Sequence, residues 1–273
     1  MKKVLTIAGS DSSGGAGIQA DLKTIAAHKM YGMSVITALT AQNTQGVRAV
    51  QEATPEFVAQ QIDAVFQDIV PDAVKVGMVS SSEIIAVIAE KMQTYHVKRL
   101  VVDPVMVATS GSVLLQPSAV TNLTTLLFPL STVITPNILE AEFLWGQKIT
   151  SKEEMMACGA ALAQKFQCSV LVKGGHLVET ANDFLYDKKN GGQWFTGERI
   201  ANPNTHGTGC TLSSSIACEL AAGVPLNKAV AASKKYLTGA LKAGLNLGQG
   251  SGPLDHLYNL QRRDVLAAAK NER

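Results

Sequence analysis

The 273-residue sequence lacks an apolar run long enough to cross a membrane, because nothing in it approaches eighteen continuous apolar residues. It also lacks a run of basic residues interleaved with aromatic ones, and its net charge is only +2. Nucleic acids and anionic membranes are recognised through such basic surfaces. Neither is therefore expected as a partner of this protein.

Cysteine pairs with zinc or redox spacing are also absent. The apolar run from Val4 to Ala8 is too short for the core of a secretory signal, and no cleavage-like site follows it. We therefore expect a cytoplasmic location, where thiols stay reduced. The four cysteines, none of which forms a CxxC motif, are Cys158, Cys168, Cys210 and Cys218.

Low-complexity linkers and internal repeats are missing too, so one domain over residues 1–273 is expected. Hydrophobic residues make up 46% of the chain, which is enough for a sizeable core. Short Val-, Ile- and Leu-rich runs alternate with amphipathic stretches of helical period, which predicts an α/β fold with a mostly parallel sheet between helices. The predicted strands are Lys3–Ala8, Ser34–Thr40, Ala73–Gly77, Arg99–Val102, Thr132–Thr135 and Ser169–Lys173.

The pattern changes after Gly175. Asn190-Gly191-Gly192 predicts the turn of a β-hairpin, and Gly223-Val224-Pro225 predicts a stop between two helices. A charged surface helix is expected beyond Gln261. The hairpin strands and the two helices are predicted at Asn182–Asp187, Gln193–Thr196, Thr208–Ala222 and Asn227–Ala243.

Polar and glycine-rich residues follow nearly every predicted strand. The carboxyl ends of parallel strands lie at one edge of a sheet, where α/β proteins bind their ligands. We therefore expect a single cleft at that edge. Its segments would be 9–15, 40–44, Gly77-Met78, Asp103-Pro104, Thr135-Pro136-Asn137 and 173–176.

The segment from Thr205 to Thr211 opens a predicted helix. Its glycines would let a phosphate approach free N–H groups, and the helix dipole favours negative charge there. Cys210 falls in the first turn, where the pKa of a thiol tends to fall. A lone cysteine usually packs in the core, as we expect for the other three, but the preceding Gly-Thr-Gly favours a functional role here.

The run from Gly15 to Ala20 matches the G-x-G-x-x-A pattern of dinucleotide-binding proteins. Such a site needs an acidic residue near the end of the second strand. None occurs between Met33 and Gln51, which argues against a nicotinamide cofactor. We interpret these glycines as a tight strand-to-helix turn that could contact a substrate.

Charged residues near the strand ends suggest a phosphate and metal site. Asp103 closes an apolar strand, and the segment from Asn137 to Glu140 opens a helix. Their carboxylates could hold Mg²⁺ against nucleotide phosphates, or they could cap a turn or a helix. Lys173 could bridge phosphates or remain a solvated charge. His206 could act as a base, but a histidine beside a phosphate loop is as often a spacer, and we leave it out of the catalytic set.

Taken together, these motifs resemble those of the hydroxymethylpyrimidine/phosphomethylpyrimidine kinases, a branch of the ribokinase-like superfamily. The resemblance covers essentially the whole chain, with the motifs in the same order. They are Thr6–Asp11, Gly14–Thr24, Thr37–Thr44, Lys75–Met78, Asp103–Met106, Thr135–Asn137, Val172–His176 and Asn204–Thr211.

The resemblance implies a ribokinase-like three-layer α/β/α sandwich without a separate lid domain, and a homodimer. It implies ATP-dependent phosphorylation of 4-amino-5-hydroxymethyl-2-methylpyrimidine and then of its monophosphate, in thiamine biosynthesis, with Mg²⁺ as the cation. The substrate-binding residues that it implies are Gly9, Ala16, Asp21, Gln42, Met78 and Val105.

The resemblance also assigns the catalytic and phosphate-binding positions. It places the metal at Asp103 and Glu140 and the nucleotide phosphates at Asn137, Lys173 and Thr208. Many sugar kinases of this fold have an aspartate where this chain has a cysteine, so no general base is identified; positioning supplies much of phosphoryl transfer. The catalytic set comprises Lys173 and the anion hole of Gly207, Thr208, Gly209 and Cys210.

Two other functions stay open. A pyridoxal kinase of the same superfamily is the closer alternative, and the run from Ala41 to Thr44 favours the pyrimidine branch over it. A catalytically inactive binder of the pyrimidine or nucleotide is the second, against which the intact Asp103 and Lys173 argue. The adenine pocket is expected after Val224, and the small polar run Ala108–Ser112 is a candidate flap over the site.

Overall fold

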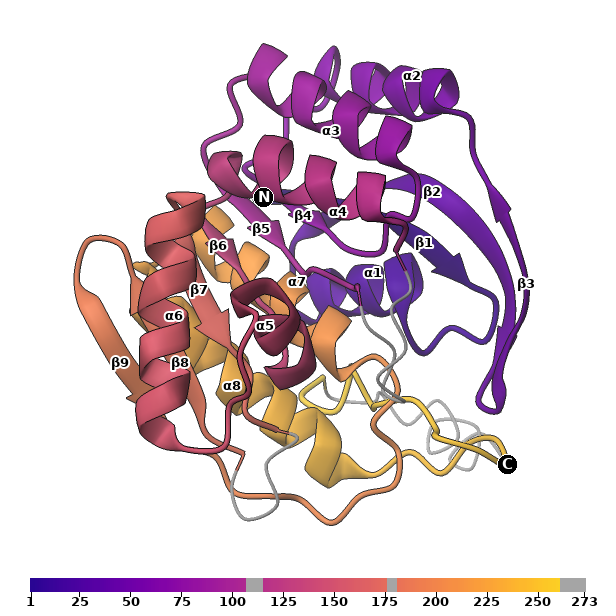
Figure 1. The fold of residues 1–273 in the computed structure, drawn as a ribbon. Helices are drawn as coiled ribbons and strands as arrows, with labels where there is room; N and C mark the ends of the chain where they lie inside the picture. Colours follow the sequence, from indigo (N-terminus) through magenta and orange to yellow (C-terminus); the bar gives the residue numbers. More distant parts are fainter. Residues whose placement is uncertain (107–114, 176–180, 261–273) are drawn as a thin grey trace, which may run out of the picture.

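The structure is a computed structural model that describes residues 1–106, 115–175 and 181–260 (Figure 1). The predicted flap Ala108–Ser112, the motif residue His176 and the predicted helix beyond Gln261 lie outside the described residues. Within the described part of the chain, no helix has the length and apolar character needed to cross a membrane.

A nine-stranded sheet in the order β3-β2-β1-β4-β5-β6-β7-β8-β9 forms the centre of the molecule. The strands from β2 to β7 in this order are parallel, and antiparallel strands complete both edges, which confirms the predicted mostly parallel α/β fold. The strands are β1 (Lys3–Asp11), β2 (Tyr31–Asn43), β3 (Gly46–Glu52), β4 (Ala73–Val76), β5 (Leu100–Val102), β6 (Val133–Ile134), β7 (Ser169–Val172), β8 (Asp183–Asp187) and β9 (Gly191–Phe195).

Helices cover both faces of the sheet, as the three-layer prediction requires (Figure 1). Alternate strand residues point to opposite faces: Leu100 and Val102 pack in one buried cluster, and Val101 packs in the other. On the first face lie α2 (Pro55–Phe66), α3 (Ser82–Thr94), α4 (Pro117–Asn122), α5 (Ile138–Trp145) and α6 (Lys152–Phe166). On the second lie α1 (Gly17–Ala27), α7 (Thr208–Ala221) and α8 (Leu226–Ala243).

All the predicted strands are present with boundaries that differ by a few residues, and so are the hairpin of β8 and β9 and the helices α7 and α8. Strand β3 was not predicted from the sequence. This strand pairs antiparallel with the end of β2, and every one of its residues is exposed. A strand without a buried face has no alternation of apolar and polar residues by which it could be found.

Candidate active site

Asp103 and Lys173 form a buried ion pair beyond the carboxyl ends of β5 and β7. Lys173 Nζ lies 2.7 Å from Asp103 Oδ1, and Thr135 Oγ1, which follows β6, donates to the same oxygen at 2.8 Å. Burial alone would raise the pKa of Asp103, but the ammonium groups of Lys173 and Lys75 lower it below its usual range. Burial would lower the pKa of Lys173, but the Asp103 carboxylate raises it. Both groups are therefore charged.

Glu140 lies close enough to this pair for the charges of Lys173 and Asp103 to shift its pKa. It forms a capping box with Asn137, because the Glu140 amide donates to Asn137 Oδ1 at 2.9 Å and the Asn137 amide donates to Glu140 Oε2 at 2.8 Å. The Met106 amide donates to Glu140 Oε1 at 3.3 Å. Burial first, with Asp103 adding to it, raises the pKa of Glu140 to about 7.

The donor set suits a magnesium ion that keeps part of its water shell. Among the described residues, no three His, Cys, Asp or Glu side chains converge on one point. Mg²⁺ is usually held by one or two carboxylates together with substrate phosphates and water. The Asp103 carboxylate helps to raise the pKa of Glu140, and a divalent cation held by both groups would relieve that repulsion.

The amino end of α7 faces the Asp103–Lys173 pair. A Cβ atom built on Gly209 would lie 3.2 Å from Asp103 Oδ2 and 3.4 Å from Lys173 Nζ, so any side chain here would fill the space between helix and ion pair. Gly207 has a φ of 86°, and its Cβ would lie 1.9 Å from the carbonyl oxygen of Gly15. Only glycine fits there. In the described chain the amides of Gly209 and Cys210 have no acceptor, and they leave two donors for an anion.

Cys210 lies in the first turn of α7, as predicted, but its pKa is not lowered. Burial raises the pKa of the thiol to about 11, even though Lys75 and the Gly17 amide act in the opposite direction. The desolvation of the thiolate thus outweighs the helix terminus on which the expectation rested. The side chain is a neutral thiol near pH 7. Cys158, Cys168 and Cys218 are buried, as predicted.

Asp21 lies beneath this turn with none of its side chain exposed. It forms an ion pair with Lys75, which is also fully buried; the Nζ to Oδ2 distance is 2.8 Å. Thr6 Oγ1 and Ser214 Oγ each donate to the Asp21 carboxylate at 2.6 Å. A contact between Asp21 and substrate stays a prediction. The pairing of Lys75 with Asp21 was not predicted, although a lysine inside an apolar strand was a visible signal.

The remaining predicted substrate residues lie at or just beyond the carboxyl ends of β1, β2, β4 and β5. A Cβ atom on Gly9 would lie 2.6 Å from Met78 Cε, so these two residues are in contact. Ala16 precedes α1 and donates from its amide to Asp11 Oδ2 at 2.8 Å. Val105 follows Asp103 by two residues, and its amide donates to the Asp103 carbonyl at 3.0 Å.

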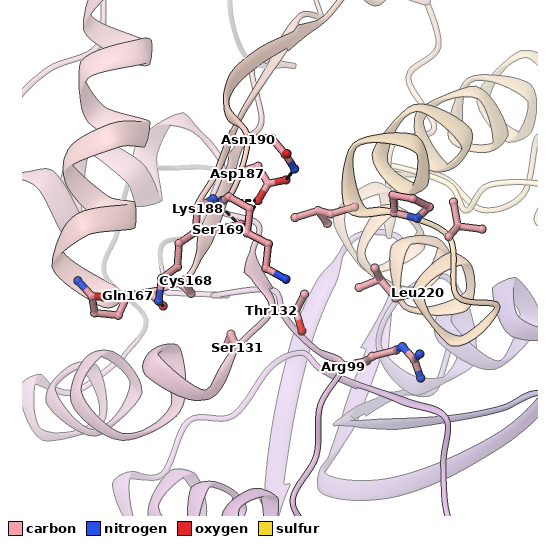
Figure 2. Close-up of a pocket in the computed structure, with 14 residues that line it drawn as sticks. Arg99, Ser131, Thr132, Gln167, Cys168, Ser169, Asp187, Lys188, Asn190 and Leu220 are labelled. Carbon is pink, nitrogen blue, oxygen red and sulfur yellow. Dashed lines mark hydrogen bonds between the residues drawn. The ribbon is translucent and has the colours of Figure 1, made fainter.

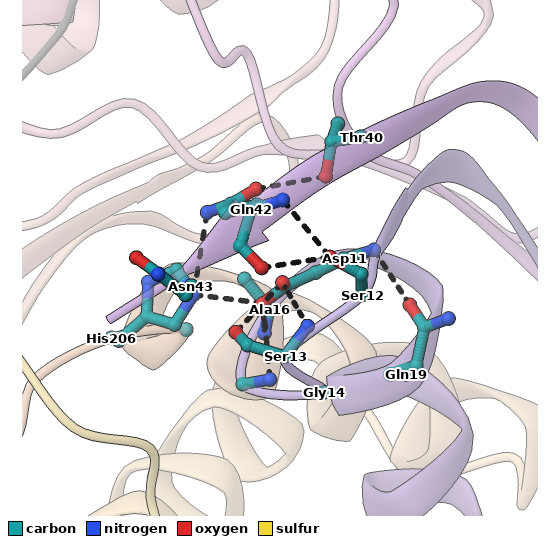
Figure 3. A network of polar contacts seen from close by, with 12 residues as sticks. Asp11, Ser12, Ser13, Gly14, Ala16, Gln19, Thr40, Gln42, Asn43 and His206 are labelled. Carbon is teal, nitrogen blue, oxygen red and sulfur yellow. Dashed lines mark hydrogen bonds and ion pairs between the residues drawn. The ribbon is translucent and has the colours of Figure 1, made fainter. Parts of the chain in front are cut away.

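Gln42 at the end of β2 completes this group (Figure 3). Its backbone amide donates to Ser12 Oγ at 2.9 Å, so Gln42 is attached to the β1–α1 loop and is not a free loop residue. His206 contacts two polar side chains of this group: its Nε2 lies 2.8 Å from Asp11 Oδ2 and 3.4 Å from Gln42 Nε2. The pair of Asp11 and His206 was not predicted, because the two residues are far apart in the sequence.

A separate cavity of about 450 Å³ lies at the opposite end of the sheet (Figure 2). Arg99, Thr132 and Ser169 line it where β5, β6 and β7 begin, and Leu220 of α7 and Asp187 of β8 complete the wall. None of the predicted site residues lines this cavity. The groups that can bind phosphate and metal therefore lie at the carboxyl edge, as the strand-end pattern predicted.

Sequence comparison gives a family for this site. The family model described as phosphomethylpyrimidine kinase matches residues 11–255. A hydroxymethylpyrimidine/phosphomethylpyrimidine kinase of Rhizobium meliloti is 53% identical over 258 residues, which cover 93% of this chain and 96% of that protein. A thiamine biosynthesis bifunctional protein of Geobacter sulfurreducens is 50% identical; 93% of this chain is covered, but the chain spans only about half, 52%, of that relative.

Solved structures agree with this family. A phosphomethylpyrimidine kinase of Clostridium difficile has 51% identity and a TM-score of 0.79, covering 87% of this chain and 98% of that one. A pyridoxal kinase of Bacillus subtilis in complex with ADP has 36% identity and a TM-score of 0.88, covering 96% of this chain and 100% of that one. The family model and the high identities agree with the motifs at the strand ends, and the chain belongs to the phosphomethylpyrimidine kinase family.

Proposed function

We propose that the chain transfers a phosphoryl group from ATP to 4-amino-5-hydroxymethyl-2-methylpyrimidine, and a second one to the resulting monophosphate, in thiamine biosynthesis. One observation carries this proposal: the free amides at the amino end of α7 face the buried pair of Asp103 and Lys173. The amide donors and the Lys173 ammonium group then converge on the place where negative charge develops on the phosphoryl group during transfer.

Each charged group has a part in that transfer. Lys173 is held by Asp103 and bridges the phosphates, while the amides of Gly209 and Cys210 donate to the oxygens of the transferred group. Asn137 and Thr208 border the nucleotide phosphates. A bound Mg²⁺ ion, held through Asp103 and Glu140, would offset the charge of the triphosphate.

Cys210 acts through its place in the anion hole rather than as a base. A thiol with a pKa of about 11 is protonated near pH 7 and does not repel the incoming phosphate. It is also a poor proton acceptor at that pH. The transfer then depends on alignment and on charge stabilisation, which suits a loose transition state that needs little help from a base.

Gln42 is the proposed specificity residue. A 4-aminopyrimidine presents an amino donor beside a ring-nitrogen acceptor, and a glutamine amide presents the matching acceptor and donor. A well-formed bidentate contact of this kind contributes roughly 1–3 kcal/mol of discrimination. The pyridine ring of pyridoxal does not present this paired edge.

A steady-state assay of ADP release tests the proposal, with the pyrimidine, its monophosphate and pyridoxal as substrates. We expect turnover of both pyrimidines, and we expect Gln42→Met to lower kcat/KM for the pyrimidine about tenfold to a hundredfold more than for pyridoxal. Equal losses for both substrates would refute the pairing. Absence of turnover with either pyrimidine would refute the kinase assignment.

Pyridoxal kinase activity is the alternative that the structure keeps open. The TM-score to the Bacillus subtilis pyridoxal kinase, 0.88, exceeds the 0.79 to the Clostridium difficile phosphomethylpyrimidine kinase, although the latter is more identical in sequence. The same assay decides between them, because a pyridoxal kinase would give the higher kcat/KM with pyridoxal.

A single-domain homodimer in the cytoplasm completes the proposal. The edge strand β3 is exposed along its whole length, and Val47 and Val50 are 54% and 53% exposed. An apolar, exposed sheet edge favours pairing with another chain. Light scattering should give the mass of a dimer, and Val50→Lys should shift it toward the monomer; a wild-type monomer at high concentration would contradict the dimer.

The proposed cytoplasmic location agrees with the four free cysteines, which a reducing compartment would keep as thiols.

A further inference from the structure

The Gln42 amide lies between two polar side chains whose hydrogen bonds decide how the amide is turned (Figure 3). One end of the amide lies 3.4 Å from His206 Nε2, and the other lies 3.1 Å from Thr40 Oγ1. In the orientation shown, the nitrogen faces His206 and the oxygen faces Thr40. Each end of that arrangement meets a conflict.

The first conflict is at His206. Its Nε2 lies 2.8 Å from Asp11 Oδ2, and an ionised carboxylate can only accept hydrogen bonds. Asp11 is ionised because the amides of Ser13, Gly15 and Ala16 also donate to it, at 2.9, 3.0 and 2.8 Å. His206 Nε2 must therefore carry a proton. A protonated ring nitrogen cannot accept from an amide NH₂ group, so the amide atom beside it has to be the oxygen.

The second conflict is at Thr40. Its hydroxyl has one hydrogen, and the carbonyl oxygen of Ser10 lies 2.8 Å away and can only accept. That hydrogen is therefore used, and Thr40 Oγ1 is left to accept from Gln42. The amide atom beside Thr40 has to be the nitrogen. Acceptor-only groups at the two ends, Asp11 and the Ser10 carbonyl, thus require the same half-turn of the amide.

We propose that Asp11, His206 and Thr40 are positioning residues that hold the Gln42 amide with its oxygen toward His206 and its NH₂ group toward Thr40, and that this orientation selects the productive pose of the substrate. The proposal rests on the proposed function. The Nε2 hydrogen of His206 goes to Asp11, and its positive end lies beside the amide oxygen at 3.4 Å. The amide NH₂ group donates to Thr40 Oγ1, whose own hydrogen goes to the Ser10 carbonyl.

The orientation matters because the pyrimidine is not symmetric. Its 5-hydroxymethyl group is next to the 4-amino group and away from the ring nitrogen that pairs with Gln42. An amide oxygen on the His206 side draws the amino group to that side, and the hydroxymethyl group goes with it. His206 directly precedes Gly207, where the anion hole begins. The opposite amide orientation would direct the hydroxymethyl group toward Thr40 instead.

Packing holds the His206 ring in place for this role. A Cβ atom on Gly15 would lie 2.4 Å from His206 Cδ2, so the ring rests on the β1–α1 loop. The His206 amide donates to the Gly252 carbonyl at 3.2 Å. The side chain is only 20% exposed. Its position is thus set before a substrate binds.

A pair of substrates with opposite edges tests the proposal. The 4-amino pyrimidine offers a donor at position 4 and an acceptor at the ring nitrogen, and the 4-oxo analogue offers the reverse. We expect wild type to prefer the amino compound, and we expect His206→Phe/Thr40→Val to reduce that preference in kcat/KM about tenfold, because the released amide can turn to fit the analogue. The single variants should fall between, and Thr40→Ser, which keeps the hydroxyl, should match wild type.

A purely structural role cannot produce this result, since damage to the anion hole lowers kcat for both compounds equally. In the Gln42→Met background the same substitutions should leave the preference unchanged, because there is no amide to turn. An unchanged preference in His206→Phe/Thr40→Val, or an equal change in the Gln42→Met background, would overturn the proposal.

Nitrogen-15 NMR of the unliganded protein gives a test that needs no substrate. Long-range proton–nitrogen spectra should show His206 Nε2 protonated, and Asp11→Ala should remove this preference. A His206 ring with a proton on Nδ1 alone would overturn the proposal. Because this result does not depend on turnover, it separates failure of the amide orientation from failure of the kinase assignment.

Discussion

Replacing Lys75 by methionine removes one partner of a buried ion pair and leaves the other in place. Lys75 Nζ lies 3.0 and 2.8 Å from the two oxygens of Asp21, and neither side chain has exposed surface. Burial would lower the pKa of Lys75, but Asp21, Cys210 and Asp103 together raise it above its usual range. Lysine is therefore charged in the folded protein, and Lys75→Met leaves the Asp21 carboxylate with two hydroxyl donors and no cation.

Breaking a buried pair in this way costs about 3–5 kcal/mol, because the remaining charge is desolvated without compensation. The total stability of a domain is about 5–15 kcal/mol, so this variant should unfold at clearly lower urea concentration. Lys75→Met/Asp21→Asn removes the charge as well and keeps an acceptor for Thr6 or Ser214. We expect the double variant to be about 2 kcal/mol more stable than Lys75→Met, although it carries one more substitution.

Urea unfolding followed by circular dichroism measures both effects. Lys242→Met is the matched control, because Lys242 and Glu198 form an ion pair with side chains that are 54% and 72% exposed. Exposed pairs contribute about 0–1 kcal/mol. If Lys75→Met is as mild as Lys242→Met, or if Asp21→Asn adds to its cost, the buried pair does not stabilise the folded protein as we argue.

Three further predictions concern the charged groups of the site. Chelation of divalent cations should abolish turnover, and Asp103→Asn should lower kcat at least about a hundredfold with an unchanged circular dichroism spectrum; full activity in excess chelator would contradict the metal site. Cys210→Ser should keep the fold and part of the activity, and alkylation of Cys210 should block turnover. The rate of alkylation should rise about tenfold per pH unit below the thiol pKa of about 11. An unchanged turnover after alkylation would make the cysteine structural. The pKa of Glu140 is raised from 4.5 to about 7 in the folded state. In metal-free buffer its contribution to stability is therefore present below pH 4.5 and is lost as pH rises toward 7, with a slope of up to about 1.4 kcal/mol per pH unit. Glu140→Gln should flatten that part of the curve of stability against pH, and an unchanged slope would refute the assignment.

The strand-end pattern predicted which residues lie close together because it depends on topology rather than on side-chain detail. Asp103 and Lys173 are far apart in sequence, but parallel strands place both at the carboxyl edge, where they form an ion pair. The helix start at Gly207 was equally visible, since Gly-Thr-Gly before an amphipathic stretch is typical of an anion-binding turn.

Contacts between distant side chains could not be predicted in the same way. The distance from Asp11 to His206 depends on how the β1–α1 loop packs against the loop before α7, and no local pattern encodes that packing. The raised pKa of Cys210 has the same origin. The helix terminus is a local feature that lowers a thiol pKa, whereas the burial that outweighs it is a property of the assembled site.

The choice between pyrimidine and pyridoxal is decided by side chains rather than by the backbone. The chain superposes on a pyridoxal kinase with a TM-score of 0.88 over 96% of its length, so the two chains share their backbone fold. What can differ is the pattern of donors and acceptors that faces the ring. In this chain Gln42 offers both, and Thr40 and His206 determine which atom lies beside the anion hole. Substrate specificity in such a scaffold can therefore change through the hydrogen bonds around one amide, without any change of fold.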